Sequence, residues 1–251
     1  MAHSSTAKDL EVPELLFHTV LHCFDPANPE NPQLVFPLAT HTALATAKDF
    51  ARHALQSLGY GPEDFQILEV RTPETQTWAH GDGVLAWARA PNDWEISICL
   101  DTKPNAEKLR ATNDGADQAV LPTKELQLHY VVQTTIDLNQ DGPRMQHSEI
   151  EGVFARRAAA LKAARQQLAA LSENDEFAQY ESRENLEPTT DWPYGEDVVV
   201  HAISQTGVNH YISVKTLLDK KAHMRLRTGN RGFGLGQLES QAAHKKGGVS
   251  A

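Results

Sequence analysis

Short runs of apolar and β-branched residues recur along the chain and predict a fold rich in antiparallel strands. Two long runs, residues 14–24 and 127–137, combine Val, Phe, Thr and Ile in the way typical of strands. Shorter runs follow each of them: Phe65–Val70, Val84–Ala90 and Trp94–Leu100, then Phe177–Tyr180, Val198–Ile203 and Tyr211–Val214. Turn residues at 91–93 and 204–207 separate the last two runs of each half and predict hairpins.

A helical period lies between the first and second run of each half. In the first half the apolar stripe consists of Leu44, Ala47, Ala51, Ala54, Leu55 and Leu58. Thr40 or Thr42 is the expected N-cap, and Gly59 and Gly61 are the expected stop. In the second half Ser148-Glu-Ile-Glu151 has the pattern of a capping box, and the stripe consists of Phe154, Ala158, Leu161, Ala164, Leu168 and Leu171. Each half is therefore expected to be an α+β unit, β-α-β-β-β, with one long helix across an antiparallel sheet.

The two halves also match each other in sequence. Leu16–Asp25 aligns with Leu128–Asp137 at an offset of 112, and Trp78–Ala88 aligns with Trp192–Ala202 at an offset of 114. Trp94–Ile98 aligns with His210–Val214 at an offset of 116. A slow drift of this kind is what insertions in loops produce, so we interpret the chain as an internal duplication with a pseudo-two-fold arrangement.

The expected organisation has five segments. They are an N-terminal arm (1–12), a first copy (13–103), a linker (104–124), a second copy (125–218) and a basic, glycine-containing flexible tail (219–251). From residue 215 onward there are eight basic and two acidic residues, a net charge of +6 in a chain of net charge −10, which leaves −16 for the preceding residues. Such an acidic body disfavours nucleic acid and anionic membranes as partners, although the tail leaves a nucleic-acid hypothesis open.

Composition and cysteine content favour a cytoplasmic protein. No apolar run approaches the roughly 18 residues of a membrane span. The N-terminus lacks the apolar region of a secretory signal, and the acids Asp9 and Glu11 argue against a transit peptide. Two cysteines, Cys23 and Cys99, do not make a disulfide framework, and reduced thiols are expected.

The patterns that could indicate a metal are incomplete. Asp137-Leu-Asn139-Gln-Asp141-Gly142 matches the first half of a calcium loop, but the twelfth position is Ser148 where a Glu is required. His18 and His22 point to one face of a strand, about 13 Å apart, which is too far to share an ion. His201 and His210 lie on neighbouring strands without a known ligand spacing. The expectation is therefore no metal and no cofactor.

The block repeated before each hairpin provides the candidate site residues. Trp78-Ala-His-Gly81-Asp82 and Trp192-Pro-Tyr-Gly195-Glu196 each place an aromatic residue, a glycine and an acid at the entry to a strand. Packing at the end of the sheet explains this pattern well. The alternative is a ligand site, for which the candidates are Trp78, Trp87, Trp192, Tyr194 and His210. For an enzyme, His201 with Glu196 or Asp197 is the expected acid/base pair.

The second half resembles a family of uncharacterised proteins from filamentous fungi. The resemblance lies in Trp192–Ala202, Asn209–Thr216 and Tyr130–Asp137. It extends more weakly to the first half, which departs from the pattern because Trp87 replaces His201 and Cys99 replaces Lys215. It implies no established activity. The duplication, together with the lack of a local signature of nucleophilic catalysis or phosphate binding, favours a non-catalytic accessory or binding protein for an unknown small molecule or protein partner. The alternative that the resemblance leaves open is a small-molecule-binding protein or enzyme of a fungal natural-product pathway.

Overall fold

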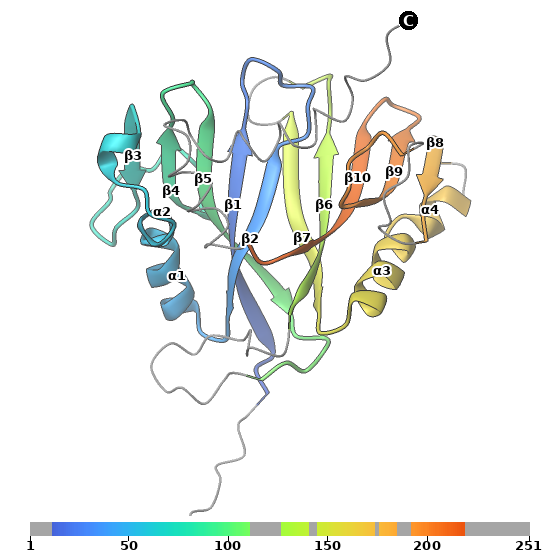
Figure 1. Ribbon diagram of the computed structural model, residues 1–251, viewed down its shortest axis with the longest axis horizontal. Helices are drawn as coiled ribbons and strands as arrows, with labels where there is room; N and C mark the ends of the chain where they lie inside the picture. Colours follow the sequence, from blue (N-terminus) through green and yellow to red (C-terminus); the bar gives the residue numbers. More distant parts are fainter. Residues whose placement is uncertain (1–11, 111–126, 141–144, 174–175, 185–191, 219–251) are drawn as a thin grey trace, which may run out of the picture.

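The computed structural model describes residues 12–110, 127–140, 145–173, 176–184 and 192–218, which form an α+β structure with two five-stranded antiparallel sheets (Figure 1). The first unit contains β1 (Leu15–Phe24), β2 (Leu34–His41), α1 (Leu44–Arg52), α2 (Ala54–Ser57), the 3-10 turn η1 (Pro62–Asp64), β3 (Ile67–Val70), β4 (Val84–Arg89) and β5 (Glu95–Pro104). The second unit contains β6 (His129–Ile136), β7 (Gln146–Phe154), α3 (Arg157–Gln166), α4 (Ala169–Glu173), β8 (Phe177–Ser182), β9 (Val198–Ser204) and β10 (Asn209–Thr216).

Both units have the same topology. The strand orders are β2-β1-β5-β4-β3 and β7-β6-β10-β9-β8, and all neighbouring strands are antiparallel. The sheets pack against each other through the faces that we call inner faces, while the helices cover the two outer faces (Figure 1). The result is a four-layer sandwich of helix, sheet, sheet and helix.

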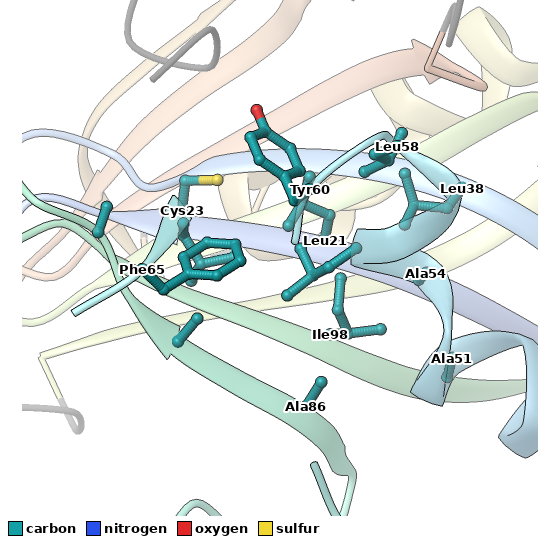
Figure 2. Packing of buried hydrophobic residues seen from close by; sticks show 14 of the residues in the cluster. Leu21, Cys23, Leu38, Ala51, Ala54, Leu58, Tyr60, Phe65, Ala86 and Ile98 are labelled. Atoms are coloured by element: carbon teal, nitrogen blue, oxygen red, sulfur yellow. The ribbon is translucent and has the colours of Figure 1, made fainter. Parts of the chain in front are cut away.

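Three hydrophobic clusters hold these layers together. In the first unit, Ala51 and Ala54 of the helices pack on Leu21, Ile98 and Ala86 of the sheet (Figure 2). The second unit repeats this arrangement with α3 on the outer face of its own sheet. The third cluster lies between the sheets and contains residues of both units: Leu16, Val20, Val35, Leu109, Leu128, Tyr130, Val132, Ile150 and Val153. The space between the sheets is therefore a packed core.

Each unit has one strand more than the sequence predicted, because β2 and β7 were not recognised. Pro37 argues against a strand, but β2 is an edge strand and Pro37 pairs next to a bulge, where a missing N–H is tolerated. The capping box was wrong: Ser148 lies within β7, and α3 begins after Arg156 without a side-chain cap. Thr40 is likewise part of β2, and the N-cap of α1 is Ala43.

The single long helix predicted for each unit is two short helices. In the first unit the break falls at His53, and the stop at Gly59 is confirmed. Gly59 has a φ of +86°, the Tyr60 N–H donates to the Leu55 carbonyl, and the Gly59 N–H donates to the Gln56 carbonyl, which is a Schellman motif.

The strand register corrects the third sequence match. Ser97 pairs with Trp87, and Tyr211 pairs with His201, so Ser97 corresponds to Tyr211 at an offset of 114 rather than 116. By the same register, the first-unit equivalent of Lys215 is Asp101 and not Cys99. The chance identity of a short Ile-Ser string produced the wrong alignment.

Several predictions concern residues outside the described ranges, namely the N-terminal arm before residue 12, most of the linker, Asp141–Gly142 of the calcium-like loop, and the basic tail. Within the described residues, no helix is both long and apolar enough to cross a membrane. Neither Cys23 nor Cys99 forms a disulfide within the described residues.

Candidate functional site

Parts of both inner faces extend beyond the opposite sheet. The sheets meet where β5 packs on β7 and β2 packs on β10, so β3 with β4, and β8 with β9, lie at the two far ends of the sandwich (Figure 1). Trp87 belongs to this inner face. Its ladder partner Ser97 pairs in turn with His22, and His22 lies two residues from Val20 of the inter-sheet core, so all of them share one face. The loop before β4, and its counterpart before β9, return across these outlying parts of the sheets.

In the first unit the returning loop builds a stack of three rings, which we call the first aromatic stack. His80 lies parallel to Trp87 with 4.5 Å between ring centroids, and Trp78 meets His80 edge-on at 4.8 Å. The Glu69 carboxylate of β3 is hydrogen-bonded to the His80 ring. The Arg89 guanidinium lies 5.6 Å from the Trp87 ring centroid, within cation–π range.

The second unit builds the equivalent second aromatic stack from Trp192, Tyr194 and His201. Tyr194 lies parallel to His201 at 3.9 Å, and Trp192 meets Tyr194 edge-on at 5.0 Å. The Tyr194 hydroxyl donates to Glu181 Oε1 at 3.0 Å, so Glu181 corresponds to Glu69. The repeated sequence block therefore covers the part of each inner face that the opposite sheet leaves open, as the packing interpretation expected.

Glycine and arginine hold both covering loops in place. Gly81 and Gly195 have φ angles of +93° and +119°, a region in which other residues are strained. Arg71 donates to the Asp82 carbonyl at 2.8 Å, and Arg183 donates to the Val198 carbonyl at 2.7 Å. Arg183 also donates to the Gly195 carbonyl at 3.1 Å, so in each unit the arginine that follows β3 or β8 holds the end of the loop.

The predicted acid/base group is not assembled as expected. His201 is only 3 % exposed, and burial lowers the pKa of its ring, while Glu181 acts in the opposite direction. Asp197 instead forms an ion pair with Lys215 at 3.2 Å, and Glu196 is exposed. A catalytic role of His201 stays a prediction, and Glu181, which sequence reasoning missed, is the carboxylate that acts on it.

His210 does not join the second aromatic stack. It precedes Tyr211, whose neighbour across the ladder is His201, so His210 points to the opposite face of the sheet. There its ring meets Phe177 edge-on at 5.7 Å, and burial lowers its pKa. Within the described residues, no group of three His, Cys, Asp or Glu side chains is arranged to hold a metal ion.

A shallow depression of about 550 Å³ opens beside the first aromatic stack. It is lined by Glu69, Val70, Thr75, Thr77, Trp78 and Ala79. It adjoins β3, the edge strand of its sheet, on which Ile67 is 41 % and Val70 is 36 % exposed. Sequence reasoning found Trp78 here but missed the edge, because an apolar residue in a short strand looks the same whether it is buried or exposed.

The centre of the sandwich contains buried polar groups. His18 Nδ1 and the Tyr130 hydroxyl each lie 2.8 Å from Thr40 Oγ1, and the His18 and Tyr130 rings meet edge-on. Burial, with the charge of Lys103, lowers the pKa of His18 to about 3, so the ring is neutral at physiological pH. Burial also raises the pKa of Tyr130. These groups are internal to the core and face no opening.

No protein-family model, curated protein or solved structure matches this chain. The candidate site therefore rests on geometry alone.

Proposed function

We propose that this chain is a non-catalytic binding protein that captures a segment of a partner protein along the open edge of β3. The observation that carries the proposal is the pair of exposed β-branched side chains, Ile67 and Val70, on an edge strand beside the Trp78 depression. An edge strand offers unpaired N–H and C=O groups, and proteins normally protect it unless another chain is meant to pair with it.

Comparison with the second unit supports a specific role for this edge. Strand register places Gln179 and Ser182 of β8 at the positions of Ile67 and Val70, so the equivalent edge is polar. β8 also has a bulge between Phe177 and Gln179, whereas the pairing of β3 with β4 is regular. Bulges and polar side chains protect edges from unwanted pairing, and β3 has neither protection at these positions.

The regular ladder gives the edge enough length for a partner. Backbone bonds to β4 extend the pairing from the Gln66 N–H, which donates to the Arg89 carbonyl, to the Arg71 N–H, which donates to the Leu85 carbonyl. Six residues thus have an extended path at this edge, which is sufficient for strand addition by a short peptide.

The common topology of the two units supports their origin by internal duplication, as we infer from the sequence matches. Bulges fall at equivalent places in both ladders, at Thr19/Val20 and at Val131/Val132. In this proposal one copy kept a protected edge and the other acquired a binding edge. The resemblance to fungal proteins supports a role as an accessory protein of a natural-product pathway.

The test is a matched pair of double substitutions at the two edges. Ile67→Lys with Val70→Lys places charge on the β3 edge, and Gln179→Lys with Ser182→Lys does the same on β8. A partner is first identified by co-purification from the source cells, and its Kd is then measured by calorimetry. We expect at least about a tenfold loss of affinity for the β3 pair, roughly 1.4 kcal/mol, and no loss for the β8 pair. Equal affinity for both variants would contradict the proposal.

The second aromatic stack supports a second candidate, a small-molecule-binding protein or enzyme. Its rings include Tyr194 and His201 and adjoin Glu181 and Tyr211, a set able to hold a planar or hydroxylated ligand. Native mass spectrometry distinguishes the candidates. A bound mass of a few hundred daltons that is lost in Tyr194→Ala and kept in the β3 variant would favour this second function.

A further inference from the structure

We propose that the partner segment is extended and basic, with Lys or Arg alternating with apolar residues, and that it adds to the first sheet as a sixth strand beside β3. This inference rests on the proposed function and names the chemistry of its partner. It follows from three properties of the edge: the alternation of its side chains, the lining of the depression, and the local charge.

The side chains of β3 alternate between two different surroundings. Leu68 and Val70 lie on the helix-covered face, where Leu68 packs against the core of the first unit. Ile67 and Glu69 lie on the inner face, where Glu69 pairs with Trp87 across the ladder. Because a strand added at an edge follows the same period of two, its residues alternately meet the apolar face of Leu68 and Val70 and the inner face, where the Glu69 carboxylate lies beside Ile67.

The depression provides a site for a cationic side chain. Its lining includes Trp78, Glu69, Thr75 and Thr77, of which Thr75 also accepts from the Thr72 N–H and Glu69 also bonds His80. An aromatic face favours a Lys ammonium or an Arg guanidinium, the carboxylate supplies an opposite charge, and the hydroxyls accept hydrogen bonds. The depression is therefore suited to the Lys or Arg side chains that the alternation places at every second residue of the added strand.

The net charge around the β3 edge is negative, like that of the Glu69 carboxylate. Residues 62–82 contain five carboxylates, those of Glu63, Asp64, Glu69, Glu74 and Asp82, and one arginine, Arg71. Two arginines of other elements lie close by: Arg52 donates to the Arg71 carbonyl, and Arg89, opposite Ile67 in the ladder, forms an ion pair with Glu95. Arg71 is engaged by Asp82, whose carboxylate lies 3.5 Å away and whose carbonyl accepts its hydrogen bond. The negative potential attracts a basic segment, and it repels a second copy of this chain, which carries −10 overall. A basic segment of another protein is thus the favoured occupant.

Synthetic hexapeptides test the inference on the full-length, wild-type chain. The probe is (Arg-Val)3, compared with (Thr-Val)3, (Glu-Val)3 and the block peptide Arg-Arg-Arg-Val-Val-Val. Amide hydrogen exchange at residues 66–71 locates the binding, and titration gives the affinity. We expect (Arg-Val)3 to slow exchange on β3 and to bind at least about tenfold more tightly than each of the other three peptides.

Substitutions then assign the charge preference to Glu69. Glu69→Lys should abolish the preference for (Arg-Val)3 over (Thr-Val)3, and Glu69→Gln should reduce it, whereas Glu181→Lys at the equivalent position of β8 should leave it unchanged. Exchange at Trp87 verifies that the first aromatic stack is intact, since Glu69 also bonds His80.

The outcomes separate this inference from the function on which it rests. Equal protection of β3 by (Thr-Val)3 and (Arg-Val)3 would overturn the basic preference and leave the edge as a binding site. Equal binding of the block peptide would overturn strand addition, because it would show attraction by charge alone. If no peptide protects β3, both proposals fail. Protection, before any peptide is added, of the β3 amides that do not bond β4 would overturn the inference by showing that a second copy or the chain's own tail occupies the edge.

Discussion

Individual buried histidines show how the core depends on protonation. His18 is fully buried, and a positive charge on its ring would be repelled by Lys103 and His41. The ring therefore stays neutral down to a pH of about 3 in the folded protein, whereas an unfolded histidine takes up a proton near pH 6.5. His22 behaves similarly, with a pKa lowered to about 4 by burial and by His147. Such groups stabilise the fold above pH 6.5, and this stabilisation is lost as the pH falls toward their folded pKa values.

Replacing His18 by Gln should therefore flatten the dependence of stability on pH. Between pH 6.5 and pH 4 only the unfolded state binds a proton on such a histidine. The free energy of unfolding of the natural chain therefore falls by about 1.4 kcal/mol per pH unit for each such group. We expect the slope for His18→Gln to be smaller by about 1 kcal/mol per unit, measured by urea unfolding at several pH values. His53→Gln, at a side chain that is 63 % exposed, is the matched control and should keep the natural slope. Identical slopes for all three proteins would contradict the assignment.

At the scale of elements, Gln146 is one of the side chains that connect the two units. Gln146, the first residue of β7, accepts a hydrogen bond from the Gln33 N–H at 2.7 Å. Its amide nitrogen donates to the carbonyls of Pro29 and Asn31, each at 2.6 Å. Gln146 thus anchors the β1–β2 loop of the first unit to the second unit. Gln33 adds a bond of its own to Ser148 at 2.8 Å.

Truncation of this anchor should loosen the loop without unfolding either sheet. Gln146→Ala leaves the Gln33 N–H without its acceptor, which costs about 1–2 kcal/mol. We expect faster hydrogen exchange at Gln33 and at residues 28–31, with exchange in β4 and β9 unchanged. Gln66→Ala removes a comparable side chain whose one bond, to the Pro91 carbonyl, stays within the first unit, and it should leave the loop as it is. Unaltered exchange at Gln33 in the Gln146 variant would show that the anchor is not needed.

The same elements show what the sequence can and cannot predict. Eight of the ten strands among the described residues were predicted, because they have runs of β-branched or aromatic residues bounded by turn residues. Thr40 and Ser148 were misread as helix caps, since a hydroxyl before a helical period has the same local pattern in a strand. Contacts distant in the sequence decide between a cap and a strand residue: Thr40 bonds Tyr130 of the other unit, and Ser148 bonds Thr134 of the neighbouring strand β6. The Trp192–Tyr194–His201 group was predicted by residue type, but Glu181 and the open edge of β3 depend on register and exposure, which no local pattern encodes.

The whole molecule resembles a dimer built from one chain. Each unit has its own core between helix and sheet, but the central parts of both inner faces are covered through the shared inter-sheet cluster. Equivalent residues meet there: Leu16 and Leu128 are both fully buried, and His18 lies against its counterpart Tyr130. A unit on its own would expose this apolar face to water, at a cost of about 25 cal/mol for each Å². The two units should therefore fold as one cooperative structure.

Leu128→Ala tests this cooperation, because Leu128 contributes to the shared cluster and to neither helix-covered core. Removing the buried side chain should lower the free energy of unfolding by about 2–5 kcal/mol. If the cluster couples the units, β4 of the first unit and β9 of the second lose amide protection at the same, lower urea concentration. Leu44→Ala, at a helix residue that is 42 % exposed, should change the stability by no more than about 0.5 kcal/mol. Loss of protection in β9 while β4 keeps its natural midpoint would show two independent domains, and the inner faces would then be stable without each other.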